Sequence, residues 1–279
     1  MLNTDYTKEH LNKAKMAEFL WVAESEDAKG FAEELTNRTI EYEAEVDPRD
    51  RKRRRVDHLN FQRAVAAFAA DLLHHSLNHD SLGFMYRHSN RSDFEDTFVS
   101  HRSFDQLKLF WSGMSLMEIT KSIQVKQTWE GEATDAVFYS KACRFRGLPA
   151  LFKIAEKYGI EPATIKEHFK REFSKFIPVT IKDERYDRKG WRIRPTKVKI
   201  KGKRYDLEAE RVRELNAYLA TSGFDLTEPP RVYRLFNRGN LPTFDFNMGG
   251  RLYCCSEDNW QSMNRERRPF ITCAVTPDA

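Results

Sequence analysis

A chain of 279 residues can hold one large domain or two smaller ones, and 40% hydrophobic residues with 20 Phe exclude a disordered tail. No apolar run approaches the roughly 18 residues of a membrane span, and the polar N-terminus has no signal peptide, so a cytoplasmic protein without a membrane partner is expected. The four Cys include adjacent Cys254 and Cys255 and no CxxC spacing, which argues against a disulfide framework and a zinc site.

The charge is distributed unevenly along the chain. The net charge is +5, but residues 1–48 hold 12 acidic and 5 basic residues, whereas residues 151–205 hold 17 basic and 7 acidic ones. Residues 189–204 contain 8 basic residues and no acidic one. This asymmetry favours a polyanion, nucleic acid above all, as the partner of the middle of the chain. The alternative is a solvated basic face without a partner.

The first 46 residues form an acidic segment for which a helix is predicted. Leu11, Phe19 and Phe31 belong to a loose apolar stripe at helical spacing. Three roles remain open for this segment: packing on a basic domain, binding a protein partner through residues 1–48, or masking the basic region.

A charged linker is predicted at residues 47–55. Its run of basic residues at 51–55 is either a phosphate-binding arm or a solvated helix start. The helix that follows, residues 56–77, carries Phe61 and Phe68 on one apolar face and is predicted to enter a core. The histidines at its end lack the spacing of a metal site and fit a helix C-terminus better.

Residues 56–175 are predicted to form a domain of winged-helix type. A strand is expected at 83–87, and a capping box at Ser103 opens a further helix. Alternating apolar residues predict strands at 123–129 and 137–145. The order helix, strand, helix and two-stranded ribbon is that of a winged helix.

A helix-turn-helix signal follows at residues 149–169. Gly159 suits the left-handed turn between two helices, and the second helix would present Lys166, Lys170 and Arg171 to a groove of DNA. The alternative is an ordinary αα-hairpin with a basic outer face.

Residues 176–205 alternate apolar and basic side chains and are predicted to form a β-hairpin with its turn at 194–196. Such a basic ribbon either lies along a phosphate backbone or is a lysine-protected sheet edge. Its basic face would carry Arg192, Arg194, Lys197, Lys199 and Lys201.

A helix capped by Asp206 and ended by Gly223 is then expected, followed by a strand at 231–236 and a Gly-Gly-Arg turn. This last region resembles a poorly characterised family of phage and bacterial mobile-element proteins. The shared pattern is Arg-x-Phe-Asn, Phe, Gly-Gly-Arg-Leu-Tyr, Trp-Gln and a later Arg. The matching residues are Arg234, Phe236, Asn237, Phe246, Gly249, Gly250, Arg251, Tyr253, Trp260, Gln261 and Arg268.

The same region is distantly similar to the segment before the palm strand of family A DNA polymerases. The resemblance implies that Gly250-Arg251-Leu252, Gln261 and Arg268 line a template-primer duplex beside the metal ions. The strand with the first metal-binding Asp should begin near Ile271, but Asp278, the one carboxylate there, follows a Pro and has no Tyr-Ser after it. The resemblance therefore implies that this chain does not polymerise nucleotides alone.

Together these features predict an α+β protein with three parts: an acidic helical segment (1–46), a winged-helix-like and helix-turn-helix-like middle (56–175), and a basic β-hairpin with a mixed, incomplete palm-like C-terminal region (176–279). The predicted function is DNA binding, DNA being favoured over RNA, in the replication of a phage, plasmid or other mobile element or its control. No catalytic residue, metal or cofactor is predicted.

Two alternatives remain: a truncated polymerase-like nucleotidyltransferase, and a protein-interaction module that uses the acidic segment. The residues expected to contact nucleic acid are Lys166, Lys170, Arg171, Arg192, Arg194, Lys197, Lys199, Lys201, Arg234, Asn237, Arg251, Tyr253, Gln261 and Arg268.

Overall fold

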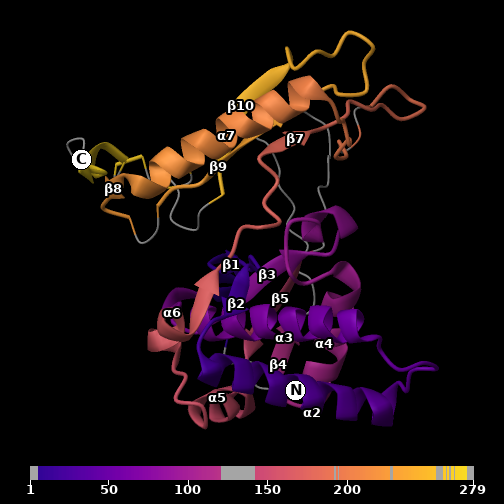
Figure 1. Cartoon of the computed structure of the whole chain (residues 1–279), viewed down its shortest axis with the longest axis vertical. Coiled ribbons are helices and arrows are strands. Elements are labelled where there is room, and N and C mark those ends of the chain that lie inside the picture. The colour runs from indigo at the N-terminus through magenta and orange to yellow at the C-terminus, as the bar shows by residue number, and fades with distance from the viewer. Residues whose placement is uncertain are drawn as a thin grey trace. The chain divides into compact units, whose positions relative to one another are not determined.

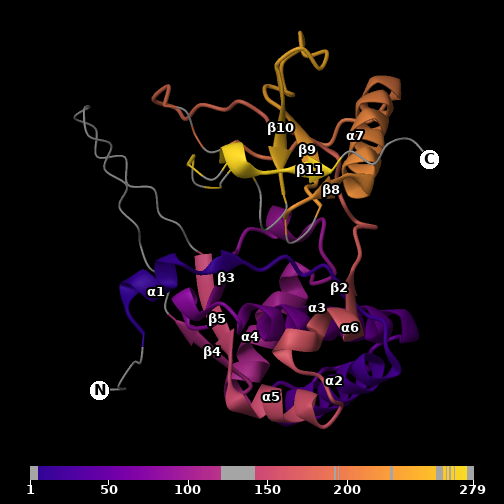
Figure 2. The same cartoon turned by 90° about the vertical axis from the view of Figure 1, so that its left-hand side faces the viewer.

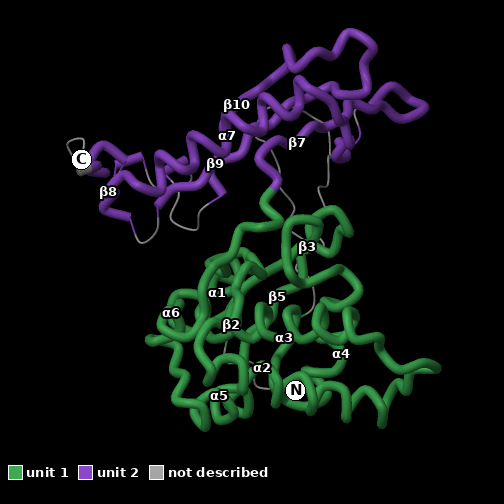
Figure 3. The backbone as a smooth tube through the Cα atoms, in the orientation of Figure 1, with its two compact units in different colours: residues 1–176 green, residues 177–279 purple. Residues whose placement is uncertain are grey.

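The computed structural model describes residues 6–120, 142–191, 193, 195–226, 229–255, 260–261, 263, 265–266 and 268–274. It divides into two compact units, Met1–Phe176 (unit 1) and Ile177–Ala279 (unit 2) (Figure 3). Both units combine helices and strands, which confirms the α+β class. In the described part of the chain, no helix combines the length and the apolar character needed to cross a bilayer.

Unit 1 is built from two long helices, several short ones and six strands among its described residues (Figure 1). The first half contains α1 (Lys8–Asn12), β1 (Lys15–Met16), β2 (Trp21–Ala23), α2 (Glu26–Val46), α3 (Arg55–His75) and β3 (Met85–His88). The second half contains the 3₁₀ helix η2 (Arg91–Phe94), α4 (His101–Gly113), β4 (Met117–Thr120), β5 (Ala142–Gly147), α5 (Pro149–Glu156), α6 (Ile165–His168) and β6 (Phe169–Arg171). Short 3₁₀ helices lie at His79–Ser81 and Pro162–Thr164.

The main sheet of unit 1 has the order β1-β3-β5-β4, with β5 antiparallel to both β3 and β4. β3, β5 and β4 lie side by side in Figure 2, with α4 beside them. Phe68 of α3 stacks on Phe145 of β5 at a centroid distance of 5.4 Å and meets Trp111 of α4 edge-on. The Trp111 indole also donates a hydrogen bond of 2.9 Å to Thr39 of α2, so a single core joins the sheet to the long helices.

The start of unit 1 differs from the helix predicted for residues 1–46. Beyond α1 the chain is mostly extended as far as α2, and Phe19 adopts a positive φ of 57°. Asp71 of α3 explains this path, because its buried carboxylate accepts hydrogen bonds from the Phe19 amide at 2.6 Å and the Trp21 indole at 2.9 Å. The helix at 26–46 packs on α3 and shares the core of residues 61–169, so the acidic segment is part of unit 1.

The helix-turn-helix prediction for residues 149–169 is wrong in its second half. α5 and the turn at Gly159, with φ 66°, form as expected. The second helix, however, is only the four-residue α6, and the chain then continues as β6, which pairs antiparallel with β2. Phe169 is buried there against Phe31, at a centroid distance of 6.4 Å. The partner strand lies about 150 residues earlier, which local periodicity does not reveal.

Two further expectations in unit 1 need comment. α4 begins at His101 and is capped by Ser100, whose hydroxyl accepts from the Ser103 amide at 3.1 Å; Ser103 is therefore not the cap. The strand predicted at 123–129 lies outside the described residues. So does most of the strand predicted at 137–145, whose last residues coincide with β5.

Unit 2 consists of one long helix and a three-stranded sheet, with short strands at its end. Its described elements are β7 (Val179–Ile181), α7 (Lys203–Thr221), β8 (Gly223–Phe224), β9 (Val232–Phe236), β10 (Gly249–Cys254), the 3₁₀ helix η4 (Arg268–Phe270) and β11 (Cys273–Ala274). The sheet order is β10-β9-β7, with β9 antiparallel to β10 and parallel to β7. α7 runs alongside β9 (Figure 1).

A small core joins α7 to one face of this sheet. Val179 and Ile181 of β7, Phe236 of β9, and Ala209 and Val212 of α7 are its buried residues. Polar contacts add to it, since the Asn216 side chain bonds the backbone N–H and C=O of Val232 at 2.8 and 2.9 Å. α7 begins three residues before Asp206, which lies in the first turn and is not the cap.

Candidate nucleic-acid interface

Residues 182–201 of unit 2 form a loop that we call the basic hairpin. Its base is a bridge between Lys182 and Lys197, flanked by hydrogen bonds from Val198 N to Ile181 O at 2.8 Å and from Asp183 N to Thr196 O at 3.0 Å. Farther out, two more backbone hydrogen bonds join the arms, Ile193 N to Arg185 O at 3.0 Å and Asp187 N to Trp191 O at 2.8 Å. The arms therefore run antiparallel, as predicted.

The turn of the basic hairpin lies at residues 187–190, so the turn predicted at 194–196 is wrong. Asp187 accepts hydrogen bonds from the amides of Lys189 and Trp191 at 2.9 and 2.8 Å, and Gly190 adopts a φ of 79°. An Asp at the first position of a turn and a Gly with positive φ at the last are common turn chemistry. Residues 187–190, Asp-Arg-Lys-Gly, carry this turn signal, and Pro195 offers a competing one in the same sequence.

Asp183 fixes the base of the basic hairpin. Its carboxylate accepts hydrogen bonds from the backbone amide and hydroxyl of Thr196, at 2.5 and 2.7 Å, and forms an ion pair of 2.8 Å with Arg185. Burial alone would raise the pKa of Asp183, but the hydrogen bonds from Thr196 and the charge of Arg185 outweigh it and lower the pKa. The two arms are thus tied together by a carboxylate that stays ionised.

The basic hairpin presents aromatic and basic side chains together at the surface. Trp191 is 62% exposed and Tyr186 is 56% exposed, although large aromatic side chains are usually buried. Lys197 is half-buried. Arg192 and Arg194 lie outside the described residues. The exposed basic residues of the described hairpin and the start of α7 are Arg185, Arg188, Lys189, Lys199, Lys201, Lys203 and Arg204.

The cations predicted on the helix-turn-helix lie in unit 1 and differ in accessibility. Lys166 of α6 and Lys170 of β6 are exposed. The Arg171 side chain is only 8% exposed, forms an ion pair of 3.2 Å with Glu18, and lies 4.9 Å from the ring centroid of Trp21. Arg171 therefore stabilises the β2–β6 pair, and its guanidinium is not available to a phosphate.

The two glycines of the Gly-Gly-Arg segment form a β-bulge at the start of β10, where the register with β9 shifts. Both have positive φ, and a Cβ on Gly250 would lie 3.0 Å from a ring carbon of Phe236. Arg234 donates a hydrogen bond of 2.9 Å to the Gly250 carbonyl and pairs with the buried carboxylate of Glu208. These two glycines and Arg234 therefore have a structural role that the sequence pattern alone did not indicate.

Gln261 and Arg268 also make contacts within unit 2. The Gln261 side chain bonds the Cys254 amide at 2.8 Å and the Leu252 carbonyl at 2.9 Å, so it continues the hydrogen bonding of β10. Arg268 donates to the backbone carbonyls of Met263 and Gln261 at 2.9 and 2.7 Å. Both side chains hold the C-terminal loop against β10.

The remaining predicted residues lie on the sheet of unit 2. Arg251 is exposed on β10, and Tyr253 stacks on Tyr233 of β9 at a centroid distance of 5.7 Å. Asn237 is half-buried just beyond β9, and its backbone amide bonds the Met248 carbonyl at 3.0 Å. The sequence pattern included Tyr253 but missed Tyr233, its partner across the strands.

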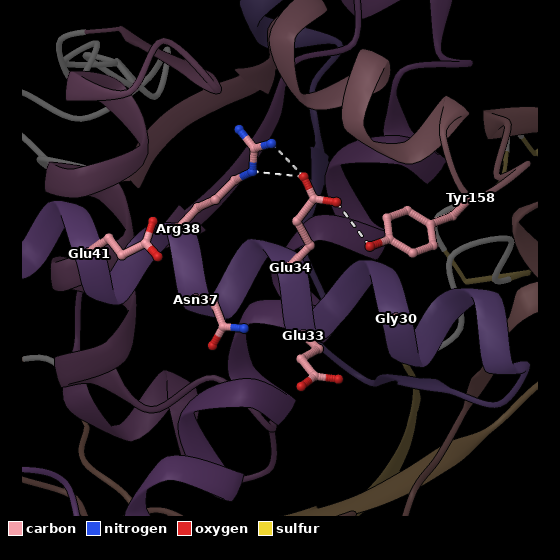
Figure 4. Close-up of a pocket in the computed structure, with 7 residues that line it drawn as sticks. All are labelled: Gly30, Glu33, Glu34, Asn37, Arg38, Glu41 and Tyr158. Carbon is pink, nitrogen blue, oxygen red and sulfur yellow. Dashed lines mark hydrogen bonds and ion pairs between the residues drawn. The ribbon is translucent and has the colours of Figure 1, made fainter.

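Unit 1 has a shallow depression of about 490 Å³ that is acidic in character. Glu34 lies at its centre and accepts a hydrogen bond of 2.9 Å from Tyr158 (Figure 4). Burial tends to raise the pKa of Glu34, but hydrogen bonds from Tyr158, Arg38 and Lys157 outweigh it and lower the pKa. The same contact raises the pKa of Tyr158. The lining residues are Gly30, Glu33, Glu34, Asn37, Arg38, Glu41 and Tyr158, a set that repels a polyanion.

Within the described ranges, no three His, Cys, Asp or Glu side chains are grouped so as to hold a metal ion. Comparison with protein-family models, curated proteins and solved structures finds no match to this chain. The resemblances to mobile-element proteins and to family A polymerases therefore stay predictions. The strongest candidate interface is the basic hairpin, with the sheet of unit 2 beside it.

Proposed function

We propose that this chain binds DNA, and that the basic hairpin makes the main contacts to the phosphate backbone. The observation that carries the proposal is the exposure of Trp191 and Tyr186 among five exposed basic residues of one short hairpin. Aromatic rings interleaved with cations suit a ligand with both phosphates and bases. A lysine-protected sheet edge requires the cations but not an exposed Trp, so the hairpin fits nucleic acid better.

The order of elements in unit 1 supports DNA over RNA. α3, β3, η2, α4, β4 and β5 follow one another along the chain, and β3, β5 and β4 are neighbours in that order in the sheet, which is compatible with the predicted winged helix. In that arrangement α4 would be the recognition helix. α4 exposes Arg102 and Leu109, the latter to 63%. This face carries few cations, so we assign it a secondary role beside the basic hairpin.

A role in the replication of a mobile element, or in its control, extends this proposal and rests on the sequence resemblance of the Gly250-Arg251-Leu252 segment. The nucleotidyltransferase alternative is less favoured. Among its scattered carboxylates, Asp245 and Glu266 are exposed in loops, and Glu257 and Asp258 lie outside the described residues. Phosphoryl transfer needs carboxylates that share a metal ion.

A protein-interaction role for residues 1–48 remains the second alternative. It would use α2, whose outer face is acidic, but Phe31 and Leu35 of the same helix are fully buried in unit 1. Deleting these residues would therefore remove part of the core. Masking of the basic hairpin is better tested by removing negative charge from α2. If α2 does not mask the hairpin, the double variant Glu33→Gln and Glu41→Gln should leave DNA affinity unchanged.

The direct test is a salt titration of binding to a fluorescent duplex. Binding through several phosphate contacts predicts that the logarithm of the binding constant falls linearly with the logarithm of salt concentration, by about 0.9 for each contact. We expect a slope of magnitude about 4–6, from the exposed cations of the basic hairpin. Absence of duplex binding at about 50 mM salt, where such contacts are strong, would contradict the proposal.

A further inference from the structure

The two faces of the unit 2 sheet differ in what they contact. Side chains alternate between faces along a strand, and Val232 and Phe236 of β9 are buried while Arg234 pairs with Glu208 of α7. These three therefore lie on the α7 side. Tyr233 and Leu235, which alternate with them, lie on the opposite side, which we call the outer face.

The strand register gives the neighbours of Tyr233 and Leu235 on the outer face. In β10, Tyr253 is opposite Tyr233 and Arg251 is opposite Leu235. On the other side of β9, Thr180 of β7 is also opposite Leu235. Alternation from the buried Ile181 then places Lys182 on the outer face, where it faces Lys197 across the hairpin base. The outer face thus consists of Thr180, Lys182, Lys197, Tyr233, Leu235, Arg251 and Tyr253.

The outer face has its two aromatic rings at one end, on β10 and β9, and its cations beside them and toward the other end. Tyr233 and Tyr253 are stacked, with 25° between their ring planes. Arg251 lies on the edge strand β10, and Lys182 and Lys197 lie beyond β7. Four neighbouring chain segments are separated by three steps of about 4.8 Å, so the face is about 14 Å wide from β10, which carries Tyr253 and Arg251, to the hairpin arm that carries Lys197. This width accommodates several unstacked bases.

This arrangement suits a single strand better than a duplex. In a duplex the faces of the bases are stacked inside and only their edges are accessible, so a broad surface of rings has nothing to stack on, whereas a single ring on a narrow hairpin can enter a groove. A single strand presents both base faces and phosphates, and base–aromatic stacking contributes about 1–3 kcal/mol for each base. The opposite face of the sheet is filled by the α7 core and is not available.

We propose that the outer face binds single-stranded DNA, with bases stacked on Tyr253 and Tyr233 and phosphates held by Arg251, Lys182 and Lys197. The proposal rests on the proposed function, which identifies the polymer as DNA. It adds single-stranded DNA to the duplex as a ligand, and it adds the outer face to the basic hairpin as a binding surface. The basic hairpin would hold the duplex, while the outer face takes a strand that has been separated.

The test compares Tyr253→Leu with Tyr253→Phe, which keeps the ring. The probes are a labelled thymidine oligonucleotide of about 15 nucleotides, chosen to exceed most single-strand site sizes, and a labelled duplex. We expect Tyr253→Leu to weaken oligonucleotide binding about 10-fold, Tyr253→Phe to restore it to within about 2-fold of the unchanged protein, and duplex binding to stay within about 2-fold in both variants.

Several results would overturn the inference. One is unchanged oligonucleotide binding by Tyr253→Leu; another is an equal loss of duplex and oligonucleotide binding. If hydrogen exchange shows that Tyr253→Leu disrupts β10, Arg251→Gln decides instead, since its side chain is exposed. Arg251→Gln should then lower the oligonucleotide salt slope by about 0.7, and an unchanged slope rejects the inference.

The unchanged protein separates this inference from the proposed function. Binding of the duplex but not of the thymidine oligonucleotide rejects the outer-face proposal alone. Failure to bind either probe rejects the proposed function as well. A uridine oligoribonucleotide bound more tightly than the thymidine one, with the same dependence on Tyr253, would overturn the assignment to DNA.

Discussion

Some arginines of unit 1 are built into its fold, whereas the described arginines of the basic hairpin in unit 2 lie at the surface. In unit 1, Arg87 is 5% exposed, donates to the Ala17 carbonyl at 2.5 Å and lies 5.4 Å from the ring centroid of Phe19. Arg53 pairs with the buried Glu43, and Arg144 donates to the Leu11 carbonyl at 2.7 Å. In the basic hairpin of unit 2, by contrast, the described arginines and most lysines are exposed. Only the second arrangement leaves charge accessible to a large ligand.

This comparison shows why a count of basic residues does not locate a binding surface. The run at 51–55 and the pair Lys170 and Arg171 consist entirely of basic residues and are denser in positive charge than the basic hairpin, which has nine basic residues in twenty. Arg53 and Arg171, however, fix the fold through Glu43 and Glu18, although the other four residues of the run, Arg51, Lys52, Arg54 and Arg55, are exposed. Burial lowers the pKa of Arg87 although nearby Asp side chains raise it, which is the electrostatic cost of placing a cation in a core. The following predictions test this contrast.

The largest effect is expected from Asp71→Ala in unit 1. The change removes the acceptor of two buried donors, the Phe19 amide and the Trp21 indole, and each unsatisfied donor costs about 1–3 kcal/mol. We expect a loss of about 3 kcal/mol in the unfolding free energy of unit 1. Urea titration read by amide hydrogen exchange in α3 measures this without mixing the two units.

Asp57→Ala is the matched control, because Asp57 lies in the same helix and is exposed. It should lower the unfolding free energy of unit 1 by less than about 1 kcal/mol, which is the typical upper limit of the stabilisation from a negative charge at a helix N-terminus. Equal effects of the two substitutions would show that Asp71 does not organise the β2 segment.

A smaller loss is expected from Gly250→Ala in unit 2. The residue has a φ of 75°, and the added Cβ would lie 3.0 Å from a Phe236 ring carbon and 3.5 Å from the Arg234 guanidinium. We expect a loss of about 2 kcal/mol, from the left-handed backbone and the displaced ring together. Hydrogen exchange of the β9 amides reports it.

Gly190→Ala separates these two causes. Its φ of 79° imposes a similar backbone strain, but no atom lies within 4 Å of the added Cβ. The change should cost about 1 kcal/mol and should act on the basic hairpin alone. If Gly250→Ala cost no more than Gly190→Ala, the bulge would not be held by Phe236 and Arg234.

Trp191→Ala should weaken DNA binding without affecting either core. A stacked or phosphate-flanking indole contributes about 1–3 kcal/mol, so an affinity loss of about 10-fold is expected in fluorescence anisotropy. Tyr218→Ala is the control, since Tyr218 is an aromatic side chain of α7 that is 64% exposed in the same unit. A loss of the same size for Tyr218→Ala would contradict a specific role of the hairpin.

The smallest effect concerns pH and the base of the basic hairpin. The pKa of Asp183 is lowered in the folded protein, so its stabilising contribution is complete above the ordinary value of 3.8 and is lost as the pH falls through the lower, folded pKa. Acid should therefore loosen the hairpin, and the indole N–H resonance of Trp191 should shift below pH 3.8.

Asp183→Asn should remove this pH response. The control variant, Asp206→Asn, should respond to pH as the unchanged protein does. Asp206 is an exposed carboxylate in the first turn of α7 and serves as the control. A Trp191 resonance that shifts equally in Asp183→Asn would assign the response to another group.

Local patterns predicted the parts of this fold that are set by neighbouring residues. The helix around Phe61 and Phe68, the strand before Arg87 and the strand at 231–236 all appear close to their predicted places. The β2–β6 pair was not predicted, because its two strands are about 150 positions apart in the sequence and Phe169 continues a helical pattern. Nor did the extended path at Phe19, which depends on hydrogen bonds from a distant Asp71.

The candidate site was predictable in charge but not in detail. The basic composition of residues 182–204 located the hairpin, yet the roles of Arg234, Gln261 and Arg268 within unit 2 follow from partners that no motif specifies. Glycines followed by Arg suggest a phosphate contact and a bulge equally well. The positive φ values and the contact with Phe236 decide for the bulge here.

The central claim is that accessible charge in the basic hairpin, and not total charge, binds DNA. The most direct measurement compares duplex salt slopes for two triple variants with equal charge change: Lys189, Lys199 and Lys201 to Gln in unit 2, and Lys8, Lys29 and Lys153 to Gln in unit 1, all six being exposed. We predict that the first triple lowers the slope by about 2–3 and that the second leaves it unchanged to within about 0.5. Equal changes in the two triples would contradict the claim.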